Sequence, residues 1–288
     1  MRIGVTFPHE ETAKDPAAVR DFAQAVEGLG YDFILTYEHV VGADPAGRPG
    51  WHAPFTYKTP FHEPLTLFAY LAGVTQRIGL ASGIIILPQR QTVLFAKQAA
   101  EVDVLSGGRL RLGVALGWNA VEYEALNEDF HNRGRRVEEQ IEVMRLLWTR
   151  EVVDFAGRWH RIDRAGINPL PVQRPIPVWM GGAAEAAIRR IARVADGWIP
   201  FIRPGDDAAK RIEGFRAAVR EAGRDPSRVG IQAGINIEGG GPEEWRQQLR
   251  EWQALGVTHS TVGALRGDVG DQIARLRALR EAVGELAT

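Results

Sequence analysis

A glycine turn between a short apolar run and a helical run is the strongest candidate for chemistry in this sequence. Residues 177–184 read Pro-Val-Trp-Met-Gly-Gly-Ala-Ala, and a helical pattern follows over 185–195. The start of a helix presents unpaired backbone N–H groups and the positive end of the helix dipole, and glycines let the backbone approach an anion closely. Gly181, Gly182 and Ala183 are therefore candidate phosphate-binding residues. A purely structural βα turn is the alternative, because short glycine turns are common in α/β folds.

A second candidate is the acidic–imidazole pair Glu38–His39, which follows the apolar run 31–36. Imidazole changes charge near neutral pH, so His39 is suited to stabilise charge that develops on a ring or to move a proton. Glu38 would orient it. These two are the candidate catalytic residues, and a structural hydrogen-bonded pair at a strand end is the alternative.

The elements that must position these residues alternate between strand-like and helical patterns along the chain. Strand-like runs are expected at 2–7, 31–36, 78–87, 109–116, 178–180, 197–201, 229–237 and 257–262. Helical runs are expected at 17–29, 65–74, 92–105, 133–148, 185–195, 206–222, 242–255 and 269–283. The run 78–87 is almost continuously apolar, as in a strand buried on both faces.

Eight strand–helix units in succession predict an α/β fold that closes into a (β/α)8 TIM barrel, since each parallel crossover is right-handed. We expect one domain over 1–288, with insertions at 42–64, over the carboxyl-terminal mouth of the barrel, and at 150–177. An open doubly wound sheet is the competing topology. It is weakened by the lack of a Gly-x-Gly-x-x-Gly pattern at the first turn.

In such a barrel the chemistry sits where the strands end. The residues expected there are mostly glycines, aromatics and amides, which suit a planar ring better than hydrolysis. The candidates are Phe7, Glu38, His39, Ser82, Gly83, Ile84, Gly117, Trp118, Asn119, Gly181, Gly182 and Ala183. Trp51, His52 and Phe55 in the 42–64 insertion, together with Asn119, are expected to form the substrate pocket. Arg133 opens a helix, where the dipole disfavours a cation, so an anion partner would explain it; a solvated face is the alternative.

Composition narrows the class of protein. The 288 residues carry a formal net charge of −1, which favours neither nucleic acid nor an anionic membrane. No apolar run approaches the roughly 18 residues of a membrane span, so we expect a cytoplasmic protein. His9, His39, His52 and His62 contain no His-x-His pair, and no metal site is expected. Ser82 lies inside an apolar strand and does not fit a nucleophile elbow.

The chain resembles the luciferase-like monooxygenase superfamily, in particular its F420-dependent oxidoreductase branch. The resemblance covers nearly the whole length. It rests on segments that include Tyr37–Val40, Gly83–Arg90, Ala96–Ala99 with Asp103–Arg109, Leu112–Asn119, Arg133–Arg136, Asn168–Pro171 and Arg174–Gly182. Together these segments are much more specific than a single glycine pair.

The resemblance implies a TIM barrel that holds a flavin or a 5-deazaflavin at the carboxyl ends of the strands. A non-proline cis peptide of the family, which supports the ring, maps near Ser82–Gly83–Ile84. The phosphate site of the family maps onto Gly181–Ala183, with Arg133 as a further contact. The histidine that faces the ring corresponds to His39. One departure is Trp118, which stands where the sugar-phosphate dehydrogenases of this branch carry a catalytic Glu, so their acid–base chemistry is not carried over.

The sequence therefore predicts an enzyme that transfers a hydride between F420 and a small organic substrate. An FMN-dependent monooxygenase that uses O2 and a separate flavin reductase is the first alternative. A flavin-binding protein without catalysis is the second. A small-molecule substrate, a flavin or F420 reductase and a second copy of the chain, in a homodimer, are the expected partners.

Overall fold

The computed structural model describes residues 1–51, 53–202 and 205–284, so the predicted site residue His52 lies outside the described residues. Parallel strands in these ranges form a closed ring of eight positions, one of them shared by β3 and β4, in the order β1, β2, β3/β4, β5, β8, β9, β10, β11. The ring closes between Leu80 and Leu110 on one side and between Arg2 and His259 on the other. The predicted (β/α)8 TIM barrel is confirmed. The strands are β1 Arg2–Thr6, β2 Phe33–Thr36, β3 Gly79–Ser82, β4 Ile85–Ile86, β5 Leu110–Ala115, β8 Val178–Gly181, β9 Gly197–Ile199, β10 Gly230–Ile235 and β11 His259–Val262.

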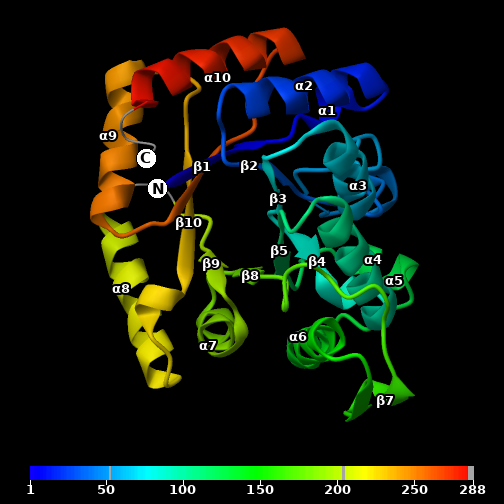
Figure 1. Cartoon of the computed structure of the whole chain (residues 1–288). Helices are drawn as coiled ribbons and strands as arrows, with labels where there is room; N and C mark the ends of the chain where they lie inside the picture. Colours follow the sequence, from blue (N-terminus) through cyan, green and yellow to red (C-terminus); the bar gives the residue numbers. More distant parts are fainter. Residues whose placement is uncertain (52, 203–204, 285–288) are drawn as a thin grey trace.

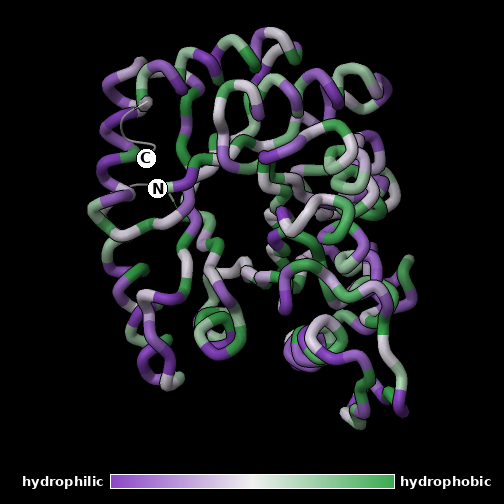
Figure 2. The backbone as a smooth tube through the Cα atoms, in the orientation of Figure 1, coloured by the Kyte–Doolittle hydropathy of each residue, from purple (hydrophilic) through white to green (hydrophobic). Residues whose placement is uncertain are grey.

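Helices surround this ring in chain order (Figure 1). The outer helices are α2 Pro16–Gly28, α3 Pro64–Val74, α4 Thr92–Leu105, α6 Arg133–Thr149, α7 Glu185–Val194, α8 Asp206–Glu221, α9 Pro242–Ala254 and α10 Val269–Val283. Helix α2 shows why they form: Asp15 accepts a hydrogen bond from the N–H of Ala17, Pro16 occupies the first turn, and one face buries Val19, Phe22 and Val26. Figure 2 shows hydrophilic and hydrophobic stretches alternating along these helices, as expected when one face packs on the barrel.

The third strand differs from the continuous strand expected over 78–87. It breaks after Ser82, and the peptide bond between Gly83 and Ile84 is cis, as the family resemblance implied. Strand β4 then spans only Ile85–Ile86 and continues into a 3-10 turn, η2, at Leu87–Gln89. Beyond the break, Ile86 pairs with Ala115 of β5, and its N–H donates to the Glu38 carboxylate that follows β2 (2.8 Å).

Several further elements were not predicted. Helix α1 His9–Thr12 and helix α5 Ala120–Ala125 follow β1 and β5. The 150–177 insertion, expected to be irregular, contains an antiparallel hairpin of β6 Val153–Ala156 and β7 Arg161–Ala165, which lies outside the ring next to α6 (Figure 1). The Glu139 carboxylate of α6 accepts the N–H groups of residues 158–160 and holds the turn of this hairpin. Short 3-10 turns lie at η1 Pro45–Gly47 and η3 Pro226–Arg228.

The 42–64 insertion folds back on itself before it reaches α3. The N–H of Tyr57 donates to the carbonyl of Ala43, and a Cβ at Gly42 would lie 2.4 Å from the Tyr57 nitrogen. Glycine is therefore required at this close approach. Among the helices of the described ranges, none combines the length and the apolar character needed to cross a membrane.

Candidate active site

A cavity of about 540 Å³ lies at the carboxyl ends of the strands. The loops after β2, β3, β5 and β8 converge on it, as the barrel architecture requires. Of the residues predicted from sequence, those on its wall are Glu38, His39, Gly83, Ile84, Gly117, Trp118, Gly181, Gly182 and Ala183. Ala184, Ala187 and Phe201 also line it.

The glycine turn after β8 leads directly into α7, and the first turn of this helix faces the cavity. Ala184 is the N-cap residue and its side chain offers no capping hydrogen bond. Ala183, Ala184 and Ala187 line the cavity, so the N–H groups of the helix start are directed toward it. An uncapped helix N-terminus with a positive dipole end suits a phosphate group.

The two glycines of this turn also keep the cavity open. A Cβ added at Gly181 would lie 3.0 Å from the Phe201 ring and 3.2 Å from the Ile84 side chain. Gly182 has a φ of +150° and a Cβ there would meet Ala187 at 2.9 Å. Side chains at these positions would fill the space between β8 and the cis peptide, so the residues present fit a flat ring with a phosphate-bearing tail.

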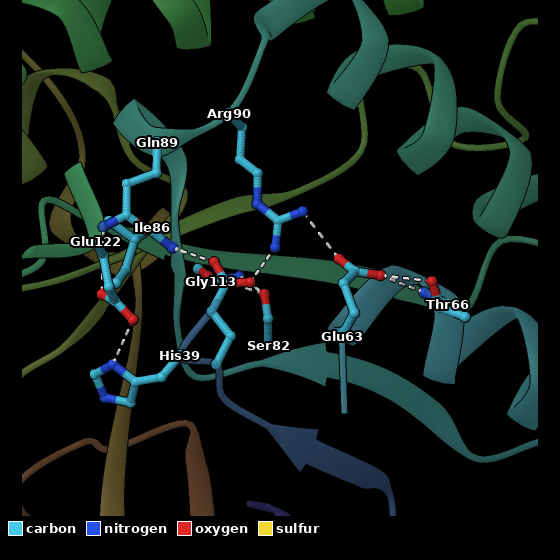
Figure 3. Close-up of polar contacts among 10 residues, drawn as sticks. His39, Glu63, Thr66, Ser82, Ile86, Gln89, Arg90, Gly113 and Glu122 are labelled. Atoms are coloured by element: carbon cyan, nitrogen blue, oxygen red, sulfur yellow. Dashed lines mark hydrogen bonds and ion pairs between the residues drawn. The ribbon is translucent and has the colours of Figure 1, made fainter. Parts of the chain in front are cut away.

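His39 is oriented by a carboxylate that sequence reasoning missed. Its Nδ1 lies 2.9 Å from Oε1 of Glu122, and Nε2 of Gln89 donates to Oε2 of the same carboxylate at 3.3 Å (Figure 3). The Glu122 side chain is fully buried. It belongs to α5, whose first turn is capped by the Asn119 side chain.

Glu38 points elsewhere, so the expected orientation of His39 by Glu38 is wrong. One carboxylate oxygen of Glu38 accepts the Ile86 N–H, and the other pairs with the Arg90 guanidinium, which also binds Glu63 at 3.0 Å. Burial raises the pKa of the Glu38 carboxyl, and the Arg90 charge and the Ile86 hydrogen bond oppose that rise. Adjacent residues on an extended segment project to opposite sides, which explains why the neighbours do not pair.

Aromatic side chains from the 42–64 insertion and the β5 loop surround His39. Ring centroids of Phe55, Phe61 and Trp118 lie 5.1, 5.2 and 5.8 Å from the imidazole centroid. Trp51 packs against Trp118 with centroids 5.8 Å apart. The insertion thus packs against two residues of the cavity wall, His39 and Trp118, and Trp118 is still 46% exposed.

Trp51 and Phe55 contact residues of the cavity wall without lining it, and four further predicted site residues do not reach the wall. Phe7 is buried among Phe22, His9 and His62. The Ser82 hydroxyl is engaged by the backbone of Gly113, at 2.8 Å to both its N–H and its carbonyl. Asn119 caps α5.

The fourth, Arg133, stacks on the Phe130 ring, and its guanidinium lies 3.6 Å from the ring centroid. It also donates to the Phe130 carbonyl. These contacts hold Arg133 at the start of α6 outside the cavity wall.

A separate cavity of about 360 Å³ lies between the start of α2 and α3. It shares no lining residue with the larger cavity and contains none of the predicted site residues. A search of residues 1–51, 53–202 and 205–284 finds no group of three or more His, Asp or Glu side chains able to hold a metal ion.

Comparisons with known proteins agree with this geometry. The sequence profile described as luciferase-like monooxygenase matches residues 1–238. An uncharacterized protein of Mycobacterium tuberculosis is 33% identical over 265 residues, which cover 89% of this chain and 88% of the relative. The FMNH2-dependent dimethylsulfone monooxygenase of Pseudomonas fluorescens is 28% identical over 217 residues, 74% of this chain and 56% of the relative.

Among solved structures, an F420-dependent secondary alcohol dehydrogenase superposes with a TM-score of 0.78 at 17% identity, over 98% of both chains. At this identity the likeness concerns the fold. The profile match covers most of the chain and carries the assignment: the chain belongs to the luciferase-like monooxygenase family, a family of flavin- or F420-dependent oxidoreductases.

Proposed function

We propose that the chain transfers a hydride between the 5-deazaflavin F420 and a small organic substrate. The observation that supports this most strongly is one cavity that holds both the uncapped start of α7 and the imidazole of His39. When bound, the cofactor supplies the two-electron chemistry, and the protein supplies position and polarity.

Different residues of the chain would bind the cofactor, support its ring and transfer the proton. The N–H groups at Ala183 and the start of α7 would hold the phosphate, since the Gly182 N–H already donates to the Ile199 carbonyl, and the Gly83–Ile84 segment would support one face of the ring. His39 would stabilise charge or move a proton at Nε2. Trp51, Phe55 and Trp118 would cover the substrate and exclude water. One domain over 1–288, acting as a homodimer, remains part of this proposal.

An FMN-dependent monooxygenase fed by a flavin reductase is the second candidate. It is favoured by the Pseudomonas fluorescens relative, whose name states FMNH2 dependence. Both cofactors would use the same features, because each combines a phosphate, which the start of α7 suits, with a flat ring that His39 would face. The difference between the two lies in the reaction with O2, which reduced deazaflavin undergoes slowly.

The test is an absorbance titration of the purified protein with F420 and, separately, with FMN. The proposal expects saturable binding of F420 with a shifted absorption band, and no rapid O2 consumption after reduction. Tighter binding of FMN with rapid O2 consumption would replace it with the second candidate. A third outcome is that a cofactor binds, that added substrates cause no redox change, and that His39→Ala behaves like the wild type. The chain would then be a cofactor-binding protein without catalysis.

A matched control is His131→Ala, because His131 is exposed and its N–H contacts are confined to a local turn with Asp129. This variant is expected to bind cofactor like the wild type. Failure of both cofactors to bind the wild-type protein would contradict the proposed function.

A further inference from the structure

We infer that Glu122 is a positioning residue that fixes the tautomer of His39, so that any proton is exchanged at Nε2. The inference rests on the proposed function in one respect, namely that His39 faces the reacting ring. Its structural basis is independent of any cofactor: the Nδ1–Oε1 distance is 2.9 Å and the carboxylate is fully buried.

The hydrogen-bond inventory assigns the proton. A carboxylate accepts hydrogen bonds and does not donate, so the hydrogen between the two groups belongs to Nδ1 of His39. The second oxygen of Glu122 accepts from the Gln89 amide, which satisfies the other side of the carboxylate (Figure 3). Neutral His39 therefore carries its single proton on Nδ1 and a lone pair on Nε2.

The free nitrogen faces the place where chemistry is proposed. His39 lines the cavity, and no residue in the described ranges forms a hydrogen bond with its Nε2. The neighbouring rings of Phe55 and Phe61 offer no acceptor that would compete for a proton. Nε2 is thus the atom available to a substrate.

A substrate that is oxidised would lose two electrons with the hydride that the ring accepts, and the proton released from the same substrate would go to Nε2. The imidazolium formed keeps its Nδ1–H on Glu122, whose negative charge stabilises it. In the opposite direction Nε2 returns that proton to the substrate.

The local fold holds Glu122 in place. Asn119 caps α5 through the N–H of Val121 at 3.1 Å, and the Tyr123 hydroxyl donates to the Leu116 carbonyl at 2.5 Å. These two bonds tie both sides of Glu122 to the end of β5. Gln89 comes from η2, so segments after β2, β4 and β5 all contribute to the position of one imidazole.

The chain contains a matched pair that serves as a control. Nδ1 of His160 lies 2.8 Å from Oε1 of Glu139, the same arrangement of imidazole and carboxylate. This pair belongs to the β6–β7 hairpin and α6, and neither residue lines the proposed active-site cavity. Glu139→Gln therefore makes the same chemical change beside a histidine outside the cavity, at a carboxylate that also accepts three backbone N–H groups of the hairpin.

The experiment is nitrogen NMR of cofactor-free protein with ¹⁵N-labelled histidine, at a pH at which the imidazoles are neutral, with resonances assigned by single substitutions. We expect His39 with a protonated Nδ1 and an unprotonated Nε2. Glu122→Gln should mix the two tautomers of His39, because an amide can donate as well as accept, while Glu139→Gln should leave the His39 signals unchanged. A wild-type His39 protonated on Nε2 overturns the inference without any variant having to fold.

A second experiment measures the steady-state kinetics of the enzyme with its cofactor bound. Glu122→Gln should lower kcat by at least about tenfold, part of the 10²–10⁴-fold typical of general acid–base groups, with KM and cofactor affinity changed by less than about twofold. Unchanged kcat in Glu122→Gln also overturns the inference. If instead no cofactor binds the wild type, the proposed function fails, while the NMR result still decides the tautomer.

Discussion

The carboxylate of Glu38 and the guanidinium of Arg90 form a buried ion pair between the end of β2 and the segment after β4. Arg90 also binds Glu63, which caps the start of α3 by accepting the N–H of Thr66. Glu38 is only 4% exposed. The pair thus fastens the end of the 42–64 insertion to the cavity, so that Phe55 and Phe61 are held against His39.

Glu38→Gln is expected to lower the free energy of unfolding by about 2–4 kcal/mol, because one partner of a buried pair is lost while the other stays buried. Urea denaturation measures this. Glu243→Gln is the control, since Glu243 pairs with Arg246 while 70% exposed, and a change below about 0.5 kcal/mol is expected. Equal losses of unfolding free energy in the two variants would show that the Glu38–Arg90 pair stabilises the fold no more than the exposed Glu243–Arg246 pair does.

Gly181→Ala is expected to weaken cofactor binding by about tenfold, or about 1.4 kcal/mol, because the new methyl group would occupy the cavity between Ile84 and Phe201. Isothermal titration with the cofactor gives the affinity. Gly73→Ala in α3 is the control, since a Cβ there meets nothing within 4 Å. It should leave the affinity unchanged and raise stability by up to about 1 kcal/mol. If Gly181→Ala binds the cofactor as tightly as the wild type, the cofactor ring does not lie between Ile84 and Phe201.

Stability is expected to fall with acidification through His9. Burial, with the neighbouring His62 adding to it, lowers the pKa of His9 from 6.5 to about 4. The fold accommodates the neutral imidazole of His9, since its Nδ1 accepts the backbone N–H of His62 and its Nε2 contacts the Thr36 hydroxyl. The unfolded chain binds the proton first as the pH falls, so this contribution is complete above about 6.5 and is lost toward about 4.

The loss amounts to about 3 kcal/mol at its limit. Urea denaturation from pH 7 to pH 4 measures the slope, and His9→Gln should flatten it. His131→Gln, at an exposed histidine, should not. A slope that is the same in all three proteins would refute the assignment to His9.

Much of the fold was predictable because its signals are local. Alternating strand-like and helical runs gave the barrel, and α4 begins and ends where its pattern does, at Thr92 and Leu105. The break in the third strand was not visible in residues 78–87, because the run is apolar throughout and a contact that accompanies the break, from Ile86 to Glu38, spans 48 positions. The cis peptide came from the family resemblance and not from the apolar run.

The position of the glycine turn and of His39 at one cavity was predictable, because residue type and place at a strand end suffice. Glu122 was not, since it lies 83 positions from His39 in the chain. A signal was present in the spacing Asn119-x-x-Glu122, which is typical of a helix start and would have revealed α5. The stacking of Arg133 on Phe130 could not be predicted, because it depends on a turn that sequence alone does not define.

A crystal structure of the protein with bound F420 tests the central claim most directly. The account predicts a phosphate oxygen within hydrogen-bond distance of the N–H groups at Ala183, Ala184 or Glu185, and the ring between Ile84 and His39. Cofactor bound outside this cavity, or a ring with its phosphate far from the start of α7, would contradict it.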